Sequence, residues 1–235
     1  MPVQPIVVFD LDGTLADTAP DLIATLNTIL VREGLPLVRL EDARELIGAG
    51  ARALVERGFE AAGLELAPAK SDALYRDFLA HYADNLCVSS RLFPGVGEAL
   101  DELEARGFRL AVCTNKIEAH SRRLLEGLGI AGRFVAICGR DTFPYFKPDA
   151  RHLTLTIHQA GGDPSRAIMV GDSFTDIATA KAASIPVVAV TFGYTDRPVR
   201  ELDPDIAIDG FEELADAVAA IAAGWRRGGG GRDRD

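Results

Sequence analysis

Short apolar runs alternate with longer amphipathic segments through most of the chain, which is typical of a parallel sheet covered by helices on both faces. The predicted strands are Ile6–Phe9, Arg109–Cys113, Phe134–Cys138, Ala167–Gly171, Val187–Val190 and Ile206–Ile208. Between them, apolar residues at helical spacing predict helices over Val96–Arg106, Ile117–Leu128, Asp149–Ala160, Phe174–Ala183 and Phe211–Ala223. The pattern therefore predicts an α/β fold.

The stretch from residue 16 to residue 90 breaks this alternation and predicts a helical insertion. Its first helix begins near Asp17, with Pro20 in the first turn, and ends at Gly34. Further helical patterns cover Leu40–Leu46, Leu54–Phe59 and the segment after Pro68 that contains Leu74–Tyr82. We expect a core of residues 1–15 and 91–224, an insertion at 16–90 with hinges near both ends, and a disordered tail at 225–235.

Composition narrows the possible partners and location. The 235 residues are 48% hydrophobic and 26% charged, which is ordinary for a globular protein, and the net charge of −10 disfavours nucleic acid and anionic membranes as partners. No apolar segment approaches the length of a membrane span, and the N-terminus leads directly into a strand. Three cysteines without metal-ligand spacing suit reduced thiols. We expect a cytoplasmic protein, either a monomer or a homodimer.

Polar residues at the ends of predicted strands carry the candidate chemistry. They are Asp10 and Asp12, then Thr114, Asn115 and Lys116, then Asp172 and Ser173, joined by Lys147 at the start of a helix. Because the carboxyl ends of parallel strands meet at one edge of the sheet, we expect these residues to form a single site.

The spacing of the acids indicates a metal and phosphoryl transfer. Two carboxylates so close repel each other unless a cation or a shared proton intervenes. We therefore expect Mg²⁺ to be held by Asp10, Asp12 and Asp172, with Asp12 contributing its backbone carbonyl. Hydrolysis of a phosphate monoester can require an acceleration of up to about 10²¹-fold, of which general acid–base catalysis supplies roughly 10²–10⁴. Covalent catalysis and charge stabilisation must supply the rest.

Each residue then has an expected role. We expect Asp10 to be the nucleophile that forms an aspartyl-phosphate, and Asp12 to be the general acid and base. Thr114 and Lys147 are expected to stabilise the charge of the transferring phosphate. The expected substrate contacts are Gly13, Thr14 and Asn115 of the core with Gly48, Gly50 and Arg52 of the insertion, and Ser173 and Asp176 are expected to support the site. A helix-surface position is the alternative for Arg52.

Four motifs resemble those of the haloacid dehalogenase-like superfamily of phosphohydrolases. They are Asp10-Leu-Asp12-Gly-Thr14, Thr114, Lys147-Pro148 and Gly171-Asp172-Ser173-Phe-Thr-Asp176. The resemblance covers Val3 to Ala223 and implies a Rossmann-like, doubly wound parallel sheet, an inserted all-helical cap that opens and closes, and Mg²⁺ dependence. The segments Asp17-Thr18, Ile47-Gly48-Ala-Gly50 and Val187–Tyr194 are similar to the phosphoglycolate phosphatase group. The segment Phe143–Phe146 departs from the pattern because it is unusually aromatic.

The leading hypothesis is a Mg²⁺-dependent phosphatase for a small phosphomonoester, with 2-phosphoglycolate favoured over a sugar phosphate, a nucleotide or pyrophosphate. A phosphosugar mutase would need a base in the cap, and a phosphonate hydrolase would need a cap lysine. Lys70 and His81 are the only Lys and His between residues 16 and 90, and both fall on predicted helix faces. A dehalogenase would have no use for Asp12 as a proton donor. A non-catalytic module would be expected to lack one of the acids or the lysine.

Overall fold

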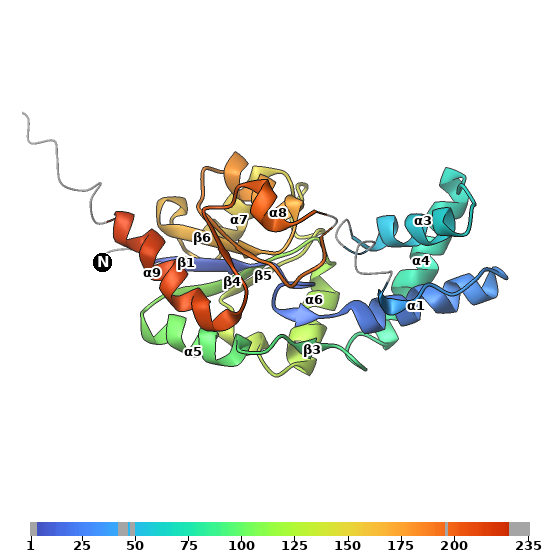
Figure 1. Cartoon of the computed structure of the whole chain (residues 1–235), viewed down its shortest axis with the longest axis horizontal. Coiled ribbons are helices and arrows are strands. Elements are labelled where there is room, and N and C mark those ends of the chain that lie inside the picture. Colours follow the sequence, from blue (N-terminus) through green and yellow to red (C-terminus); the bar gives the residue numbers. More distant parts are fainter. Residues whose placement is uncertain (1–3, 42–46, 48–49, 196, 226–235) are drawn as a thin grey trace, which may run out of the picture.

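The structure, a computed structural model, describes residues 4–41, 47, 50–195 and 197–225. An α/β core and a smaller group of helices lie side by side along the long axis of the molecule (Figure 1). The amino- and carboxyl-terminal ends of the described chain lie together at the end of the core remote from those helices (Figure 1). The connection between the two parts therefore depends on the segments that leave and re-enter the core.

Within the described chain, six parallel strands form the central sheet in the order β5-β4-β1-β6-β7-β8. They are β1 (Ile6–Phe9), β4 (Arg109–Cys113), β5 (Ala136–Cys138), β6 (Ala167–Gly171), β7 (Val187–Val190) and β8 (Ile206–Ile208). The strand β1 is central, with Phe9 in register with Val112 of β4 and Val170 of β6. The predicted α/β fold with a doubly wound parallel sheet is confirmed.

Side chains alternate across β1 and bury both faces of the sheet. Val7 and Phe9 pack in a cluster with α5 (Val96–Ala105), α6 (Glu118–Gly127) and α9 (Leu214–Trp225). Ile6 and Val8 face the opposite way and pack with α7 (Ala150–Gln159) and α8 (Phe174–Ala182). Burying one such side chain contributes roughly 1.5–3 kcal/mol. The two hydrophobic layers therefore fix β1, and the residues that follow it, in the middle of the sheet.

The helical cap has a hydrophobic core of its own. Its described helices are α1 (Ala19–Arg32), α3 (Ala51–Ala61) and α4 (Pro68–Asp84), and they pack through residues such as Leu26, Phe59 and Phe78. A Cβ atom at Gly58 would lie 2.9 Å from Leu26 Cδ1, so the glycine lets α3 approach α1 closely. Most of the predicted Leu40–Leu46 helix lies outside the described residues.

A two-stranded antiparallel ribbon links the core and the cap. It pairs β2 (Ala16–Asp17) with β3 (Arg91–Leu92). The sequence pattern did not predict it, because two-residue strands carry no measurable alternation. Both strands lie where the sequence places the ends of the cap, and the division into core and cap stays a prediction.

The last predicted helix differs from the structure at both of its ends. The segment predicted as one helix from Phe211 begins as the 3₁₀ turn η4 (Phe211–Glu213), and α9 then continues to Trp225. The indole of Trp225, the last residue of α9, lies 6.5 Å from the ring of Phe108, and the disordered tail at 225–235 stays a prediction. Residues 226–235 lie outside the described part.

Nowhere in the described part is there a helix long and apolar enough to cross a bilayer.

Candidate active site

Asp10 follows β1 directly, at the carboxyl edge of the sheet. Its backbone N–H donates to the carbonyl of Val170 over 2.9 Å, which continues the pairing with β6 and fixes the main chain at this point. The ammonium of Lys147 lies 2.9 Å from Asp10 Oδ1 as an ion pair, and among the described residues no other group donates a hydrogen bond to this buried oxygen. Burial raises the pKa of Asp10 to about 6, against the lowering effect of Lys147. The Oδ1 atom is therefore available to a ligand.

Lys147 places a buried positive charge between two carboxylates. Its side chain is 1% exposed, and its ammonium donates to Asp176 Oδ1 over 2.5 Å in addition to pairing with Asp10. The Nδ2 group of Asn115 donates to the Lys147 carbonyl over 3.0 Å and holds the segment in place. Burial alone would lower the pKa of Lys147, but Asp10 and Asp176 raise it above its ordinary value, so the side chain stays charged.

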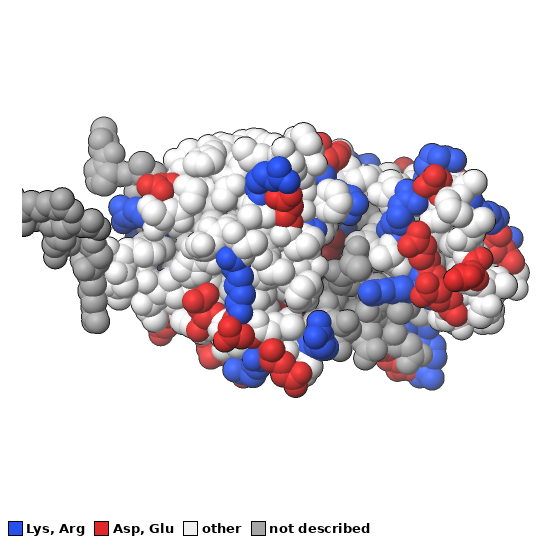
Figure 2. Space-filling model, turned by 90° about the horizontal axis from the view of Figure 1, so that it is seen from above, with Lys and Arg blue, Asp and Glu red and all other residues white. Residues whose placement is uncertain are grey.

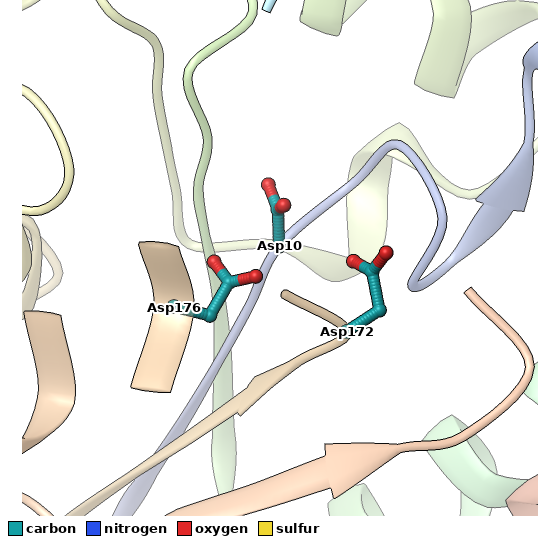
Figure 3. A group of neighbouring side chains, drawn as sticks. All are labelled: Asp10, Asp172 and Asp176. Carbon is teal, nitrogen blue, oxygen red and sulfur yellow. The ribbon is translucent and has the colours of Figure 1, made fainter. Parts of the chain in front are cut away.

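Three carboxylates form an acidic cluster at this edge of the sheet. One oxygen each from Asp10, Asp172 and Asp176 lie within 4.8 Å of one another, with Asp172 and Asp176 on either side of Asp10 in Figure 3. Burial raises the pKa of Asp172 well above its ordinary value, and the neighbouring Asp176 and Asp10 raise it further. Carboxylate oxygens at this separation, which repel one another, suit a divalent cation such as Mg²⁺ or Mn²⁺. The residues present therefore fit a divalent metal.

Thr14 binds Asp172 and Gly13 lies close to it, while the predicted contact of both residues with the substrate stays a prediction. The Thr14 hydroxyl donates to Asp172 Oδ1 over 2.7 Å, and the backbone N–H of Tyr194 donates to Oδ2 over 2.6 Å. Gly13 has a φ of +84°, and a Cβ atom there would lie 2.3 Å from Asp172 Oδ2. The turn after β1 therefore requires glycine and positions the carboxylate of a different strand.

Asp176 braces the cluster from the first turn of α8. Its Oδ2 atom accepts hydrogen bonds from the backbone N–H and the hydroxyl of Ser173, at 3.1 and 2.7 Å, as part of a capping box. The Oδ1 atom accepts from Lys147. The sequence predicted a supporting role for Asp176, and the structure places it as the third acid of the cluster.

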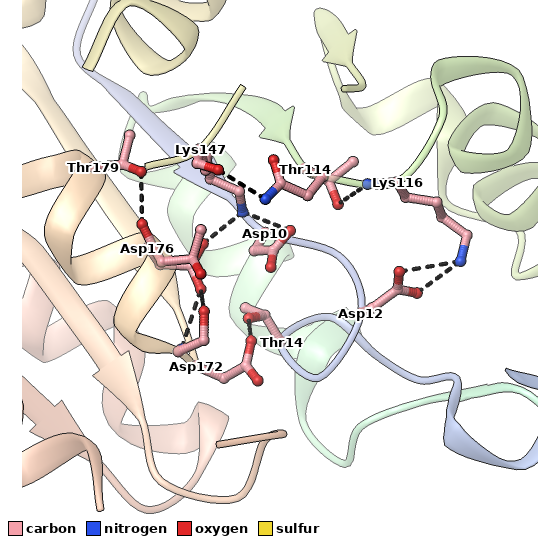
Figure 4. A network of polar contacts seen from close by, with 12 residues as sticks. Asp10, Asp12, Thr14, Thr114, Lys116, Lys147, Asp172, Asp176 and Thr179 are labelled. Atoms are coloured by element: carbon pink, nitrogen blue, oxygen red, sulfur yellow. Dashed lines mark hydrogen bonds and ion pairs between the residues drawn. The ribbon is translucent and has the colours of Figure 1, made fainter. Parts of the chain in front are cut away.

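The carboxylate of Asp12 points away from this cluster, toward Lys116 (Figure 4). The ammonium of Lys116 lies 3.0 Å from Oδ1 and 3.1 Å from Oδ2 of Asp12, and it also donates to the hydroxyl of Tyr82 over 2.7 Å. Tyr82 belongs to α4, so one core lysine connects Asp12 to the cap. The expected metal contact through the Asp12 backbone carbonyl stays a prediction.

A cavity of about 220 Å³ lies between the sheet edge and the cap. Its core wall includes Asp10, Asp12, Thr114, Asn115, Lys116, Arg140, Asp172 and Ser173. Its cap wall includes Ile47, Gly50, Arg52, Leu54, Tyr75, Leu79 and Tyr82. Cavities that hold drug-sized ligands measure roughly 300–1,000 Å³, so this one suits a smaller metabolite.

The cap residues predicted to bind substrate differ in where they lie. Gly50, with a φ of +90°, precedes α3 and lines the cavity. Arg52 also lines it, but its guanidinium donates to Asp72 over 2.7 Å and lies 4.6 Å from the ring centroid of Tyr75. Gly48 lies outside the described residues.

The sequence interpretation gave no role to several polar side chains that line the cavity, among them Lys116, Tyr82 and Arg140. Lys116 was placed with Thr114 and Asn115 at the end of a predicted strand, but its contact with Asp12 could not be predicted from that position. Tyr82 was interpreted as an apolar position of its helix, and nothing in the local pattern distinguished its hydroxyl. Arg140 follows the strand β5 and carries no motif in the sequence.

Acids at the carboxyl edge of a parallel sheet, beneath a helical cap, are the arrangement expected of a haloacid dehalogenase-like phosphohydrolase. The chain belongs to this family: the model of the haloacid dehalogenase-like hydrolases matches residues 7–190. The predicted family is therefore confirmed.

More specific similarity is to proteins named phosphoglycolate phosphatase. The protein of that name from Mesorhizobium japonicum is 53% identical over 216 residues, covering 92% of this chain and 95% of the relative. The one from Agrobacterium fabrum is 48% identical over 217 residues, with 92% and 93% covered. A crystal structure from Haemophilus somnus, described as a predicted phosphoglycolate phosphatase, superposes with a TM-score of 0.84 at 34% identity and covers 91% of this chain and 97% of that one.

Proposed function

We propose that this protein is a Mg²⁺-dependent phosphatase that converts 2-phosphoglycolate and water into glycolate and inorganic phosphate. The observation that carries the proposal is the position of Asp10, whose buried Oδ1 atom lies beside the Lys147 ammonium and within an acidic cluster at the base of a small cavity. The choice of substrate is supported by relatives that are 45–53% identical and named phosphoglycolate phosphatase.

In the first step, a carboxylate oxygen of Asp10 attacks the phosphorus, and the bond between phosphorus and the glycolate oxygen breaks. Asp12, in its protonated form, gives its proton to that leaving oxygen. Lys147 provides fixed positive charge, and Thr114 and Asn115 provide donors for the phosphate oxygens. Charge stabilisation of this kind is commonly the largest contribution to catalysis of phosphoryl transfer.

In the second step, Asp12 takes a proton from a water molecule, whose oxygen attacks the phosphorus of the aspartyl-phosphate. The bond between phosphorus and the Asp10 oxygen breaks, inorganic phosphate leaves, and both acids return to their starting states. The carboxylate of Asp12, which lines the cavity and is 20% exposed, can reach a ligand there. Its contact with Lys116 orients it.

Asp10 and Asp172 would hold the Mg²⁺ ion, together with the Asp12 carbonyl, and Asp176 supports them through Lys147 and Ser173. When bound, the ion supplies positive charge that reduces the repulsion between the phosphate and Asp10. Because hydrophobic packing on both sides fixes the strand ends, the protein presents these oxygens without reorganisation.

The other expected properties are consistent with this function. Figure 2 shows Lys and Arg side chains intermixed with Asp and Glu, without a continuous basic area on the visible face that would suit nucleic acid. The three cysteines are free thiols, which suits a cytoplasmic location. Both a monomer and a homodimer are compatible with a cavity built from one chain.

The test is phosphate release from a panel of small phosphomonoesters, with Mg²⁺ or with EDTA. We expect the highest kcat/KM for 2-phosphoglycolate, and no release in EDTA. The Asp10→Asn protein should lose activity by about 10⁴-fold or more, since removal of a nucleophile has effects of this size. A preference for another ester would move the assignment to that metabolite. Turnover by Asp10→Asn near the wild-type rate would contradict the mechanism.

A further inference from the structure

The aromatic segment Phe143–Phe146 has two arginines stacked on it. The guanidinium carbon of Arg140 lies 3.8 Å from the ring centroid of Phe146, and that of Arg151 lies 3.6 Å from the ring centroid of Tyr145. Stacking holds a guanidinium plane against the ring and leaves the N–H groups at its edges free to bind an anion. The segment therefore presents two similar cations.

The two arginines differ in their partners. Arg151 forms an ion pair with Asp149 at 2.6 Å and is not among the described residues that line the cavity. Arg140 does line the cavity, and within the described ranges no carboxylate pairs with its guanidinium. Arg140 is thus the member of the pair that can accept an anionic ligand.

The other strongly basic side chains on the cavity wall are already paired. Lys116 contacts both carboxylate oxygens of Asp12, and Arg52 donates to Asp72. Recruiting either of them to a substrate would break an existing ion pair. Of the described lysines and arginines on this wall, Arg140 is the one without such a partner.

The backbone of Arg140 is held beside the phosphate-binding segment. Its N–H donates to the Lys116 carbonyl over 2.9 Å, and Lys116 follows Thr114 and Asn115 directly. The adjacent Gly139 packs so tightly that a Cβ atom would lie 2.2 Å from the backbone nitrogen of Glu118. The base of the Arg140 side chain is therefore fixed relative to the residues that are proposed to hold the phosphate.

From this geometry we infer that Arg140 is a specificity-determining residue that binds the carboxylate of the substrate while the core acids hold its phosphate. The inference rests on the proposed function and assigns the group that recognises the non-phosphate end. A planar guanidinium can donate two parallel hydrogen bonds to a carboxylate, and stacking on Phe146 reduces the freedom that such a contact would remove. The substrate class is a short phosphomonoester with a carboxylate next to the ester carbon.

The test compares 2-phosphoglycolate with ethyl phosphate, which has a methyl group in place of the carboxylate. Arg140→Ala should lower the ratio of the two kcat/KM values by about 10- to 100-fold, the range expected for a hydrogen-bonded charged group. Most of the loss should appear in KM for 2-phosphoglycolate, because the carboxylate contact is made in both ground and transition states. Arg140→Lys should give an intermediate ratio, since it keeps the charge without the fork.

Arg151→Ala is the matched control, because it removes an arginine stacked on the same aromatic segment but paired outside the cavity. It should keep the wild-type ratio. If wild type shows no preference for 2-phosphoglycolate, the proposed substrate is wrong and this inference fails with it. If wild type shows the preference and Arg140→Ala and Arg140→Lys both keep it, the inference alone is wrong.

Discussion

Asp10 and Asp12 are separated by a single residue, yet their carboxylates have different partners. Asp10 is paired with Lys147, whereas Asp12 is held by Lys116, whose side chain is only 5% exposed. The Lys116 ammonium also lies 4.4 Å from the ring centroid of Tyr82, in addition to its bond with the hydroxyl. One lysine thus orients the proposed general acid and ties its position to the cap.

Replacing Lys116 by Met should lower kcat by about 10- to 100-fold, since general acid–base catalysis contributes roughly 10²–10⁴ and a misdirected Asp12 would lose part of it. Steady-state phosphate release gives kcat and KM separately. Lys116→Arg should recover part of the activity, and Tyr82→Phe, which removes only the accepting hydroxyl, should have a smaller effect. A wild-type kcat in Lys116→Met, confirmed as folded by its thermal melt, would show that Asp12 needs no such partner.

For single residues, the sequence predicts a role where the position at the end of a strand is enough to indicate it. The acids and Thr114 follow apolar strands, and the structure brings them to one edge. Residues whose role depends on a partner elsewhere in the chain were not predictable. The Tyr82 ring stacks on Phe78, with centroids 5.8 Å apart, and its spacing is that of an ordinary buried helix position. Only the folded structure reveals that its hydroxyl contacts Lys116.

Asp21, near the start of α1, secures the returning linker between the cap and the core. Its carboxylate accepts hydrogen bonds from the backbone N–H groups of Val88, Ser89 and Ser90, at 2.8–3.0 Å, and from the Ser90 hydroxyl at 2.7 Å. Asp21 is 3% exposed. A single buried acid therefore satisfies the main chain of a segment that forms no regular structure before β3.

Asp21→Ala should lower the free energy of unfolding by about 2–4 kcal/mol, because several backbone N–H groups would lose their acceptor. Urea denaturation measures this difference. The control is Glu102→Ala: that carboxylate pairs with Arg106 on the surface of α5, and its side chain is 52% exposed, so a much smaller change in the free energy of unfolding is expected. Equal effects of the two substitutions would mean that the linker contacts contribute no more than a surface ion pair.

Most strands were predictable from their runs of apolar residues. β1, β4, β6, β7 and the three-residue β8 agree with their predicted spans. The strand predicted from Phe134 begins instead at Ala136, because the 3₁₀ turn η1 (Ala131–Arg133) takes the N–H of Phe134, which donates to the Ala131 carbonyl. The ribbon of β2 and β3 was not predicted. Strands of two residues carry no pattern of their own, and they pair only because the rest of the fold brings them together.

The stability of the whole molecule should depend on pH through His152, which is fully buried in α7. Burial, and to a smaller extent the positive charge of the nearby Lys147, lower the pKa of His152 to about 4. The unfolded chain, with a His pKa of about 6.5, takes up the proton first as pH falls. The native state should therefore lose up to about 3 kcal/mol between roughly pH 6.5 and pH 4.

His152→Asn should flatten this dependence while keeping a donor for the Gly139 carbonyl, which lies 3.1 Å from His152 Nε2. Urea denaturation at a series of pH values measures the slope. His158→Asn, at an exposed position of the same helix, should follow the wild-type curve. An unchanged slope in His152→Asn would assign the acid sensitivity to other groups.

The acidic cluster should make the stability of the whole chain depend on Mg²⁺. A ligand at a hundred times its Kd adds about 2.7 kcal/mol to native stability, or roughly 5–10 °C in Tm for a chain of this size. Asp172→Asn should lose this Mg²⁺-dependent rise, and in EDTA at neutral pH it should melt above wild type. The raised pKa of Asp172 shows that its negative charge is less favourable in the folded state than in the unfolded chain, so removing this charge should raise the stability of the fold.

The same melting experiment with Asp12→Asn tests whether the Asp12 carboxylate binds the metal, as the Asp10 carboxylate is expected to do. Its side chain contacts Lys116 and lies outside the cluster, so a metal contact through the backbone carbonyl survives the substitution. Asp12→Asn should therefore keep the Mg²⁺-dependent rise in Tm while losing phosphatase activity. If Asp12→Asn loses the rise as completely as Asp172→Asn does, the Asp12 carboxylate must leave Lys116 to bind the metal, and the orientation seen here would belong to a state that precedes metal binding.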